Sequence, residues 1–182
     1  MAGRREFNPA KFNELVLLLV NLSTEDPRLS RVKLNKLLYR SDVEAFRLLG
    51  QSISGATYIR GEYGPMAAEL PWAEERLGER GYLSYRAEQA GPYPQKVPVA
   101  HEGADETQFS EDELAIAKRA VEELRDYGGK AVSDWSHEES AGWRLRKDDE
   151  VITYESSLID TTRRLDPERL QLLREYVATL PA

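Results

Sequence analysis

The chain has 182 residues, of which 41% are hydrophobic and 31% are charged, so it can form one globular domain with a well-charged exterior. Its 25 Lys and Arg residues against 32 Asp and Glu residues give a formal net charge of −7, which argues against indiscriminate binding of nucleic acid. Cysteine is absent, which excludes disulfides, thiol nucleophiles and thiolate metal sites and suits a reducing cytoplasm.

The first predicted helix begins at Asn8 and Pro9. Asparagine is a good helix cap and proline suits the first helical position, and apolar residues then recur at helical spacing as far as Leu22. Asp26-Pro27 ends the pattern, because proline disfavours helical geometry in the residue before it. The apolar run inside this helix, Leu15–Val20, is too short to span a bilayer, and no targeting signal is recognisable, so we expect a cytoplasmic protein.

A second helix is predicted from Ser30 to Leu49, with Ser30 as its cap and a glycine at its C-terminal end. Leucine, alanine and phenylalanine form its apolar face. The other side carries a basic stripe made of Lys33, Lys36, Arg40 and Arg47. Three interpretations of this stripe are open: a solvated charged face, a contact surface for an acidic partner, or a nucleic-acid contact.

The pattern changes after the second helix. β-branched and aromatic residues lie among glycines between Ile53 and Tyr63, which predicts a short strand or an extended loop. We expect a third helix to begin at Gly64-Pro65 and to continue to Leu77, because apolar residues recur there on one face. Pro71 lies inside this pattern and would kink the helix or split it in two.

Two short alternating runs, Tyr82–Tyr85 and Lys96–Val99, are separated by a loop rich in proline and glycine and predict a β-hairpin. Ser110, with Glu113 three residues later, forms a capping-box pattern, which predicts a helix that ends at Gly128. A helix that leads into a hairpin is also typical of winged-helix proteins, so a DNA-binding regulator of its own promoter is a second interpretation of the chain.

The C-terminal third predicts two further helices: a short one over Ala131–His137 and a last one that begins at Asp166-Pro167. The predicted fold class is therefore α+β, a mainly α-helical single domain with a short strand and a β-hairpin. We expect residues 1–145 to form this domain. Residues 146–182 would be a C-terminal extension whose final helix packs on the same domain.

Catalytic and metal-binding patterns are scarce. The chain has two histidines, His101 and His137, and His137 lacks the second histidine of a zinc helix because Ala141 stands there. Nucleophilic serine motifs and phosphate-binding loops are not found. We therefore predict that the protein is not an enzyme and has no catalytic residue, metal or cofactor. A hydrolase or metal enzyme built on the histidines is the alternative.

Aromatic residues are concentrated in the central third of the chain. They are Tyr39, Tyr58, Tyr63, Trp72, Tyr82 and Tyr85. Two roles are open for them. They can pack in the core and the sheet, or they can anchor a protein interface, where Tyr, Trp and Arg are enriched.

Several short motifs follow one another between Phe12 and Trp143. In order they are Lys33-Leu34-Asn35-Lys36-Leu37-Leu38-Tyr39, Gly50-x-x-Ile53, Tyr63-Gly64-Pro65, Leu124-x-x-Tyr127-Gly128, Trp135-Ser136-His137 and Trp143. Together they resemble the motifs of the Panacea domain, the SocA-like family. Ser136 is a departure from the family, which usually has threonine at this position.

The resemblance implies an antitoxin. Members of this family occur in bacterial and phage toxin–antitoxin pairs and neutralise unrelated toxins, typically by direct binding. Some are similar to proteolytic adaptors that deliver a toxin to a ClpXP-type protease. The expected partner is therefore a cognate toxin protein. A protease, the protein's own promoter DNA and a second copy of the chain are further candidates, and no membrane is expected.

Within the motifs we separate residues that build the fold from residues that contact a partner. The predicted structural residues are Leu34, Leu37, Leu38, Gly64, Pro65, Trp135 and His137. The predicted partner-binding residues are Lys33, Lys36, Tyr39, Arg40, Arg47, Tyr58 and Tyr63. The motifs thus divide into a leucine-rich half for folding and a lysine- and tyrosine-rich half for recognition.

Overall fold

Helices make up most of the structure, a computed structural model that describes residues 5–90, 93–159 and 167–179. The elements in chain order are α1 (Pro9–Leu22), α2 (Arg31–Leu49), β1 (Tyr58–Gly61), β2 (Gly64–Ala67), α3 (Leu70–Glu79), β3 (Leu83–Ala90), β4 (Tyr93–Ala100), the 3-10 turn η1 (Glu106–Gln108), α4 (Glu111–Leu124), α5 (Gly129–Glu139), α6 (Ala141–Leu145), β5 (Val151–Ile152), the 3-10 turn η2 (Tyr154–Leu158) and α7 (Pro167–Thr179). The predicted class, a mainly helical α+β fold, is confirmed.

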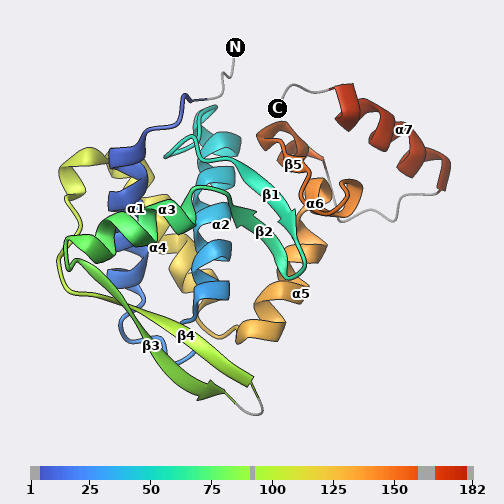
Figure 1. Cartoon of the computed structure of the whole chain (residues 1–182). Helices are drawn as coiled ribbons and strands as arrows, with labels where there is room; N and C mark the ends of the chain where they lie inside the picture. The colour runs from blue at the N-terminus through green and yellow to red at the C-terminus, as the bar shows by residue number, and fades with distance from the viewer. Residues whose placement is uncertain (1–4, 91–92, 160–166, 180–182) are drawn as a thin grey trace.

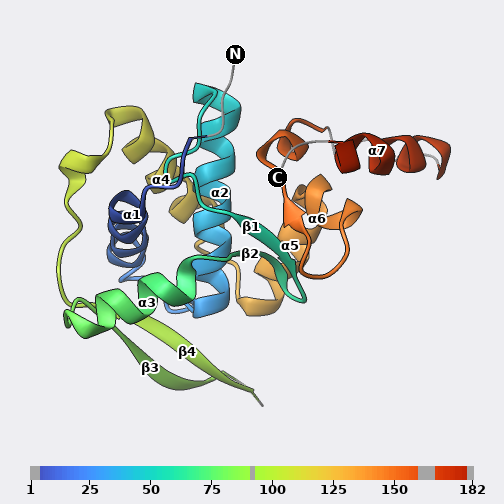
Figure 2. The same ribbon diagram turned by 45° about the horizontal axis from the view of Figure 1, so that its top comes forward.

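The longest helix, α2, lies at the centre of the molecule. Helices α1 and α4 pack on one side of it, and β2 and α5 pack on the other (Figure 1). The β3–β4 hairpin extends away from the helices at one end, as the turned view also shows (Figure 2). Because α2 is covered on both sides, its polar residues need hydrogen-bond partners from other elements.

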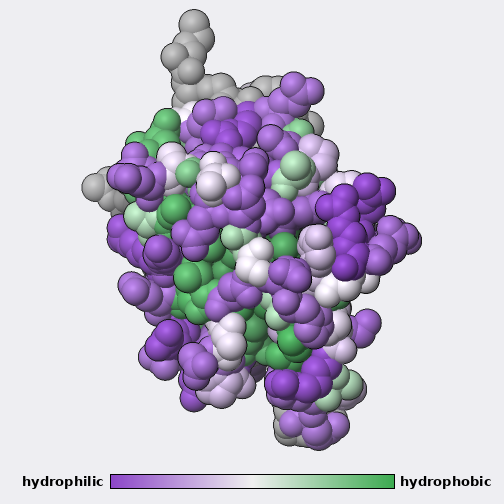
Figure 3. Space-filling view, turned by 90° about the vertical axis from the view of Figure 1, so that its left-hand side faces the viewer, coloured by the Kyte–Doolittle hydropathy of each residue, from purple (hydrophilic) through white to green (hydrophobic). Residues whose placement is uncertain are grey.

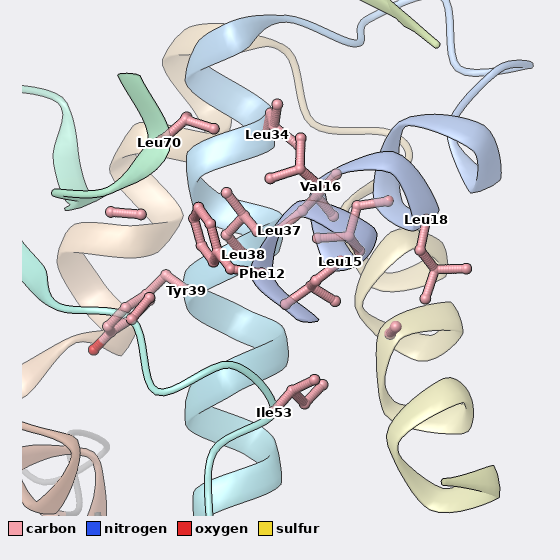
Figure 4. Close-up of a cluster of buried hydrophobic side chains, with 14 of the residues drawn as sticks. Phe12, Leu15, Val16, Leu18, Leu34, Leu37, Leu38, Tyr39, Ile53 and Leu70 are labelled. Carbon is pink, nitrogen blue, oxygen red and sulfur yellow. The ribbon is translucent and has the colours of Figure 1, made fainter. Parts of the chain in front are cut away.

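The main core lies between α1 and α2. Figure 4 shows the apolar side chains that meet there: Phe12, Leu15 and Val16 from α1 with Leu34, Leu37 and Leu38 from α2. All six are 0% exposed. Full burial of a leucine contributes about 2 kcal/mol, so this interface is a large part of the stability of the fold.

The expected ends of the first two helices are confirmed. The Asn8 side chain accepts a hydrogen bond from the backbone N–H of Lys11 at 3.0 Å, and the Ser30 side chain accepts one from the N–H of Lys33 at 3.2 Å. Gly50 ends α2 with a φ of 74°, a left-handed conformation that glycine adopts without strain.

The prediction of a helix that begins at Gly64-Pro65 is wrong. Gly64–Ala67 is strand β2, which pairs antiparallel with β1 after a turn of two residues, Glu62 and Tyr63. Gly64 has a φ of 104°, which is incompatible with a right-handed helix. Pro71 is not in a helix interior either, because it occupies the first turn of α3, where a missing N–H costs nothing.

The two small sheets join distant parts of the chain. The first has the strand order β2–β1–β5, in which Ile152 pairs with Tyr58, a residue far away in the sequence. The second is the predicted hairpin, which is confirmed and is longer than expected. Strand β5, η2 and α6 were not predicted, since pieces of two to five residues are too short to show a periodicity.

The capping box at Ser110 and Glu113 is confirmed. The helix it begins ends at Leu124, before the expected Gly128, which instead precedes the first turn of α5. At the C-terminus, α7 lies beside α6 and exposes Leu172 and Tyr176.

The face of the molecule in Figure 3 is the left-hand side of Figure 1. It is mostly hydrophilic, with hydrophobic residues gathered near its middle. In the part of the chain that the structure describes, no helix is both long enough and apolar enough to cross a membrane.

Candidate partner-binding site

The basic stripe of α2 is only partly at the surface. Lys33 and Lys36 are 0% and 1% exposed, because α4, α5 and β2 pack against the side of α2 that carries them. The expectation that these two lysines lie on a solvated or contact face is therefore wrong. Arg40 is half-buried and Arg47 is exposed.

Lys33 ties the start of α2 to two other segments. Its ammonium group donates hydrogen bonds to Asp26 Oδ2, in the loop after α1, and to the carbonyl oxygen of Arg125 at 2.9 Å, at the end of α4. The side chains of Lys33 and Asp26 are 0% and 1% exposed. Removing one partner of such a buried ion pair costs about 3–5 kcal/mol, because the other charge is left unpaired.

Lys36 lies against β2 with a different kind of partner. Its Nζ atom donates to the carbonyl oxygen of Pro65 at 3.1 Å. Burial lowers the pKa of Lys36 to about 7, because the charged form is poorly solvated there. The preceding residue, Asn35, accepts a hydrogen bond at its Oδ1 atom from the backbone N–H of Ala67 at 3.1 Å. Helix α2 is thus bonded to β2 at both Pro65 and Ala67.

At Gly64, strand β2 lies in close contact with side chains of both α2 and α5. A Cβ atom at this position would lie 2.2 Å from Oγ of Ser136 and 3.0 Å from Nζ of Lys36. The Ser136 hydroxyl donates to the carbonyl oxygen of Ser133 at 2.8 Å. We name the residues that meet here the motif cluster: Asn35, Lys36, Gly64, Pro65 and Ser136.

The motif cluster joins three motifs that are far apart in the sequence, and all five of its residues are buried. An amine with a pKa near neutrality beside a serine hydroxyl is a combination that can support nucleophilic chemistry. Lys36 and Ser136 are 1% and 0% exposed, however, and both are hydrogen-bonded to backbone carbonyls. Both side chains are therefore inaccessible to a substrate in this structure, and their contacts hold α2, β2 and α5 together.

Tyr39 and Tyr58 lie in a second buried network and are not surface residues. Their rings are in edge-to-face contact at 5.1 Å. The Tyr39 hydroxyl shares a hydrogen bond of 2.8 Å with the Ser140 hydroxyl, and the Tyr58 hydroxyl donates to Asp42 Oδ2 at 2.8 Å. Their expected position at a contact surface is wrong, because Tyr58 of β1 and Ser140, between α5 and α6, contact α2 at this point and both tyrosines are buried.

Asp42 was not among the predicted site residues. It lies on α2 four residues after Leu38 and four before Phe46, within the apolar face, and it accepts hydrogen bonds from Ser54 and Tyr58. Burial raises the pKa of Asp42, and the hydrogen bonds to its carboxyl group oppose that shift. An acidic residue in the middle of an apolar helix face was the signal that could have identified this network.

The accessible part of the motif region is built around Trp143. His137 stacks on its ring at 3.6 Å with an interplanar angle of 6°, and the guanidinium of Arg60 lies 4.3 Å from the ring centroid. Trp143 Nε1 donates to the carbonyl oxygen of Gly61 at 2.9 Å, and Arg60 Nε donates to the carbonyl oxygen of Trp143 at 3.0 Å. These contacts fix the turn between β1 and β2.

This turn presents Tyr63, whose side chain is 56% exposed. Arg60, His137 and Trp143 beside it are half-buried. Burial, with the Lys36 charge as the next cause, lowers the pKa of His137 below its ordinary value. We name Arg60, Tyr63, His137 and Trp143 the aromatic–basic patch.

The predicted partner-binding residues are not brought to one surface. Lys33 and Arg47 are 14 residues apart on α2, which is about 21 Å along the helix axis. Arg40 pairs with Glu44 at 3.2 Å and Glu123 at 3.0 Å. Arg47 lies beside the exposed Leu48 and Leu49 at the other end of the helix from Lys33.

The predicted structural residue Trp135 is half-buried in α5. Its ring makes an edge contact with Tyr127 at 6.5 Å and lies 5.9 Å from the guanidinium of Arg40. In the hairpin, the basic residue Arg86 is paired with Glu88, so β3 carries both signs of charge. Among the residues in the described ranges, no group of three or more His, Cys, Asp or Glu side chains could hold a metal ion.

Comparison with protein families identifies a known domain in the chain. A family model described as "Antitoxin SocA-like, Panacea domain" matches residues 34–144. No curated protein and no solved structure matches the chain. The matched span includes the motif cluster and the aromatic–basic patch and leaves out α7, and it confirms the resemblance inferred from the motifs.

The close contacts at Gly64 predict an unequal effect of two glycine substitutions. Gly81 also has a positive φ, of 72°, but no atom lies within 4 Å of an added Cβ, so Gly81→Ala should cost about 1 kcal/mol of stability from backbone strain alone. Gly64→Ala adds the overlap with Ser136 and Lys36 and should cost about 3 kcal/mol. Urea denaturation of both variants measures the difference, and equal costs would contradict the packing described here.

The lowered pKa of Lys36 predicts a pH-dependent stability. The pKa of Lys36 is about 7 in the folded chain and has its ordinary value of 10.5 in the unfolded chain. Between these two pH values the unfolded chain binds one more proton than the folded chain, so the free energy of unfolding rises with pH. This contribution is lost as the pH falls toward 7. Lys36→Met removes this effect.

The free energy of unfolding of the wild type, minus that of Lys36→Met, should therefore increase by roughly 3 kcal/mol between about pH 7 and about pH 9.5. Urea denaturation of both proteins across this range measures it. If the free energies of unfolding of the wild type and of Lys36→Met change in parallel with pH, Lys36 is not a buried neutral amine.

Proposed function

Because the chain belongs to the SocA-like antitoxin family of Panacea domains, we propose that it is the antitoxin of a bacterial or phage toxin–antitoxin pair and neutralises its cognate toxin by direct protein–protein binding. The family implies a toxin as the partner in general. The observation that supports a binding role most directly is the aromatic–basic patch, in which Tyr63 is exposed on a turn that hydrogen bonds between β1 and Trp143 of α6 hold in place.

The composition of this patch suits an interface. Tyrosine, tryptophan and arginine are the residues that most often dominate binding energy, and here Arg60, Tyr63 and Trp143 lie together. The hydrogen bonds of Trp143 to Gly61 and of Arg60 to Trp143 fix the turn before a partner arrives. A preorganised turn loses little conformational entropy on binding, which favours affinity.

The mechanism we propose is non-enzymatic. Lys36 and Ser136, which form the most reactive combination in the motif region, are buried and engaged with backbone carbonyls. The aromatic–basic patch offers a partner aromatic rings, a guanidinium and an imidazole, which suit recognition. Neutralisation would then result from covering a surface of the toxin in the cytoplasm.

The proposal predicts that co-expression with the neighbouring open reading frame restores growth and that the two proteins co-purify. If growth is restored but the toxin protein disappears and no complex is found, the chain is instead a proteolytic adaptor. If the chain alone binds its promoter DNA, it is a regulator. If the two proteins form no complex and growth is not restored, the antitoxin role is contradicted.

Tyr63→Ala tests the surface itself. The variant should fold as the wild type does, because surface substitutions change stability by only about 0.5 kcal/mol, and should bind the toxin at least tenfold more weakly, since an interface anchor is worth about 2 kcal/mol. Titration calorimetry with purified toxin measures this.

The matched control is Tyr176→Ala, a tyrosine of similar exposure (57% against 56%) that lies outside the family match. It should bind the toxin as the wild type does. Equal binding by both variants would show that the aromatic–basic patch is not the toxin contact.

A further inference from the structure

The β3–β4 hairpin has two outer edges, and they differ. Both ribbon views show the hairpin extending from the helices, with β3 on the outside (Figures 1 and 2). Strand β4 contacts α1 and α2, whereas β3 contacts α3. The eight paired positions run from Leu83 opposite Ala100 to Ala90 opposite Tyr93.

One backbone hydrogen bond fixes which groups point outward. The N–H of His101 donates to the carbonyl oxygen of Tyr82 at 2.9 Å, one position beyond the first pair of the ladder. Bonded and non-bonded pairs alternate in an antiparallel ladder, so the pair formed by Ala87 and Lys96 is a non-bonded one. The N–H and C=O groups of these two residues therefore point away from the partner strand.

The outer edge of β4 is protected. Pro94 and Pro98 lie two positions on either side of Lys96, so two of the outward positions on this edge carry no N–H group. Proline on an edge is a common means of preventing strand addition.

The outer edge of β3 lacks this protection. None of the residues from Leu83 to Ala90 is a proline. Within the described ranges, the outward N–H and C=O groups of Tyr85 and Ala87 have no hydrogen-bond partner. Ala87 is exposed and has the smallest side chain with a Cβ, so a second strand can approach it closely.

We propose that two copies of this chain pair their β3 strands antiparallel about a two-fold axis at Ala87. In this register Arg86 lies opposite Glu88 of the second copy, and Glu88 lies opposite Arg86 of the second copy. Both are non-bonded pairs of the new ladder, in which side chains are closest and opposite charges stabilise. The two side chains are 62% and 36% exposed and already attract each other within one strand.

The self-complementary sequence Arg86-Ala87-Glu88 favours a second copy over an unrelated strand. Pairing produces a sheet with the order β4–β3–β3–β4, and sheets of three or more strands are more stable than an isolated hairpin. Both outer edges of that sheet are β4 strands with prolines, so assembly ends at two copies. The dimer does not depend on the toxin proposal, since the aromatic–basic patch is on other elements.

Cysteine cross-linking tests the register. The chain has no cysteine, so Ala87→Cys introduces a single thiol. Residues in a bonded antiparallel pair have Cα atoms about 5.5 Å apart, within the range of a disulfide. Ala87→Cys should form a covalent dimer under mild oxidation at micromolar concentration.

The control is Lys96→Cys, at the position directly opposite on β4. In the dimer the two Lys96 positions are three strand spacings apart, about 14 Å, so this variant should stay monomeric on denaturing gels. Similar yields of covalent dimer from the two variants, or none from Ala87→Cys, would contradict the proposed register.

Proline scanning and charge reversal test the association itself by sedimentation velocity. Ala87→Pro removes an outward N–H and should give a monomer, whereas wild type and Lys96→Pro should be dimers. Arg86→Glu places two glutamates opposite each other and should weaken the dimer at least tenfold, and adding Glu88→Arg should restore it. A monomeric wild type, or charge variants that associate like it, would overturn the proposal even if the proline variants failed to fold.

Discussion

The burial of α2 over most of its length is the constraint on which the rest of the structure depends. Buried charged groups are costly without partners, and the buried charged residues of α2 have partners on other parts of the chain. Lys33 finds Asp26 and the end of α4, Lys36 finds the carbonyl of Pro65, and Asp42 finds the hydroxyl groups beside β1. These contacts orient α4, β2 and β1 around the helix.

The surface proposed for recognition follows from the same constraint. Because Lys36 binds β2 and Gly64 allows Ser136 to approach, the β1–β2 turn has a fixed position beside α5 and α6. Trp143 then completes the turn and leaves Tyr63 at its tip. The buried motif residues thus form the scaffold, and the more exposed ones, Tyr63, His137 and Trp143, form the candidate contact together with Arg60.

Local signals predicted the starts of α1, α2 and α4 and the hairpin, since a cap such as Ser30 or a capping box acts within a few residues. They failed where a partner is distant in sequence. Lys33 and Lys36 have the periodicity of a solvated face, and only the folded chain shows that Asp26 and Pro65 cover them. Gly64 followed by a proline is compatible with a helix start and with a strand, and the pairing with β1 decides between them.

The central claim is that the buried motif residues fold the domain and the exposed ones recognise the partner. A scan of single substitutions over residues 30–67, scored for protein abundance in cells and for toxin neutralisation, tests it most directly. Substitutions at the buried lysines and at Gly64 should lose neutralisation only in proportion to abundance, whereas those at Tyr63 should lose it at unchanged abundance. Variants of Lys33 or Lys36 that stay abundant but no longer neutralise the toxin would contradict the claim.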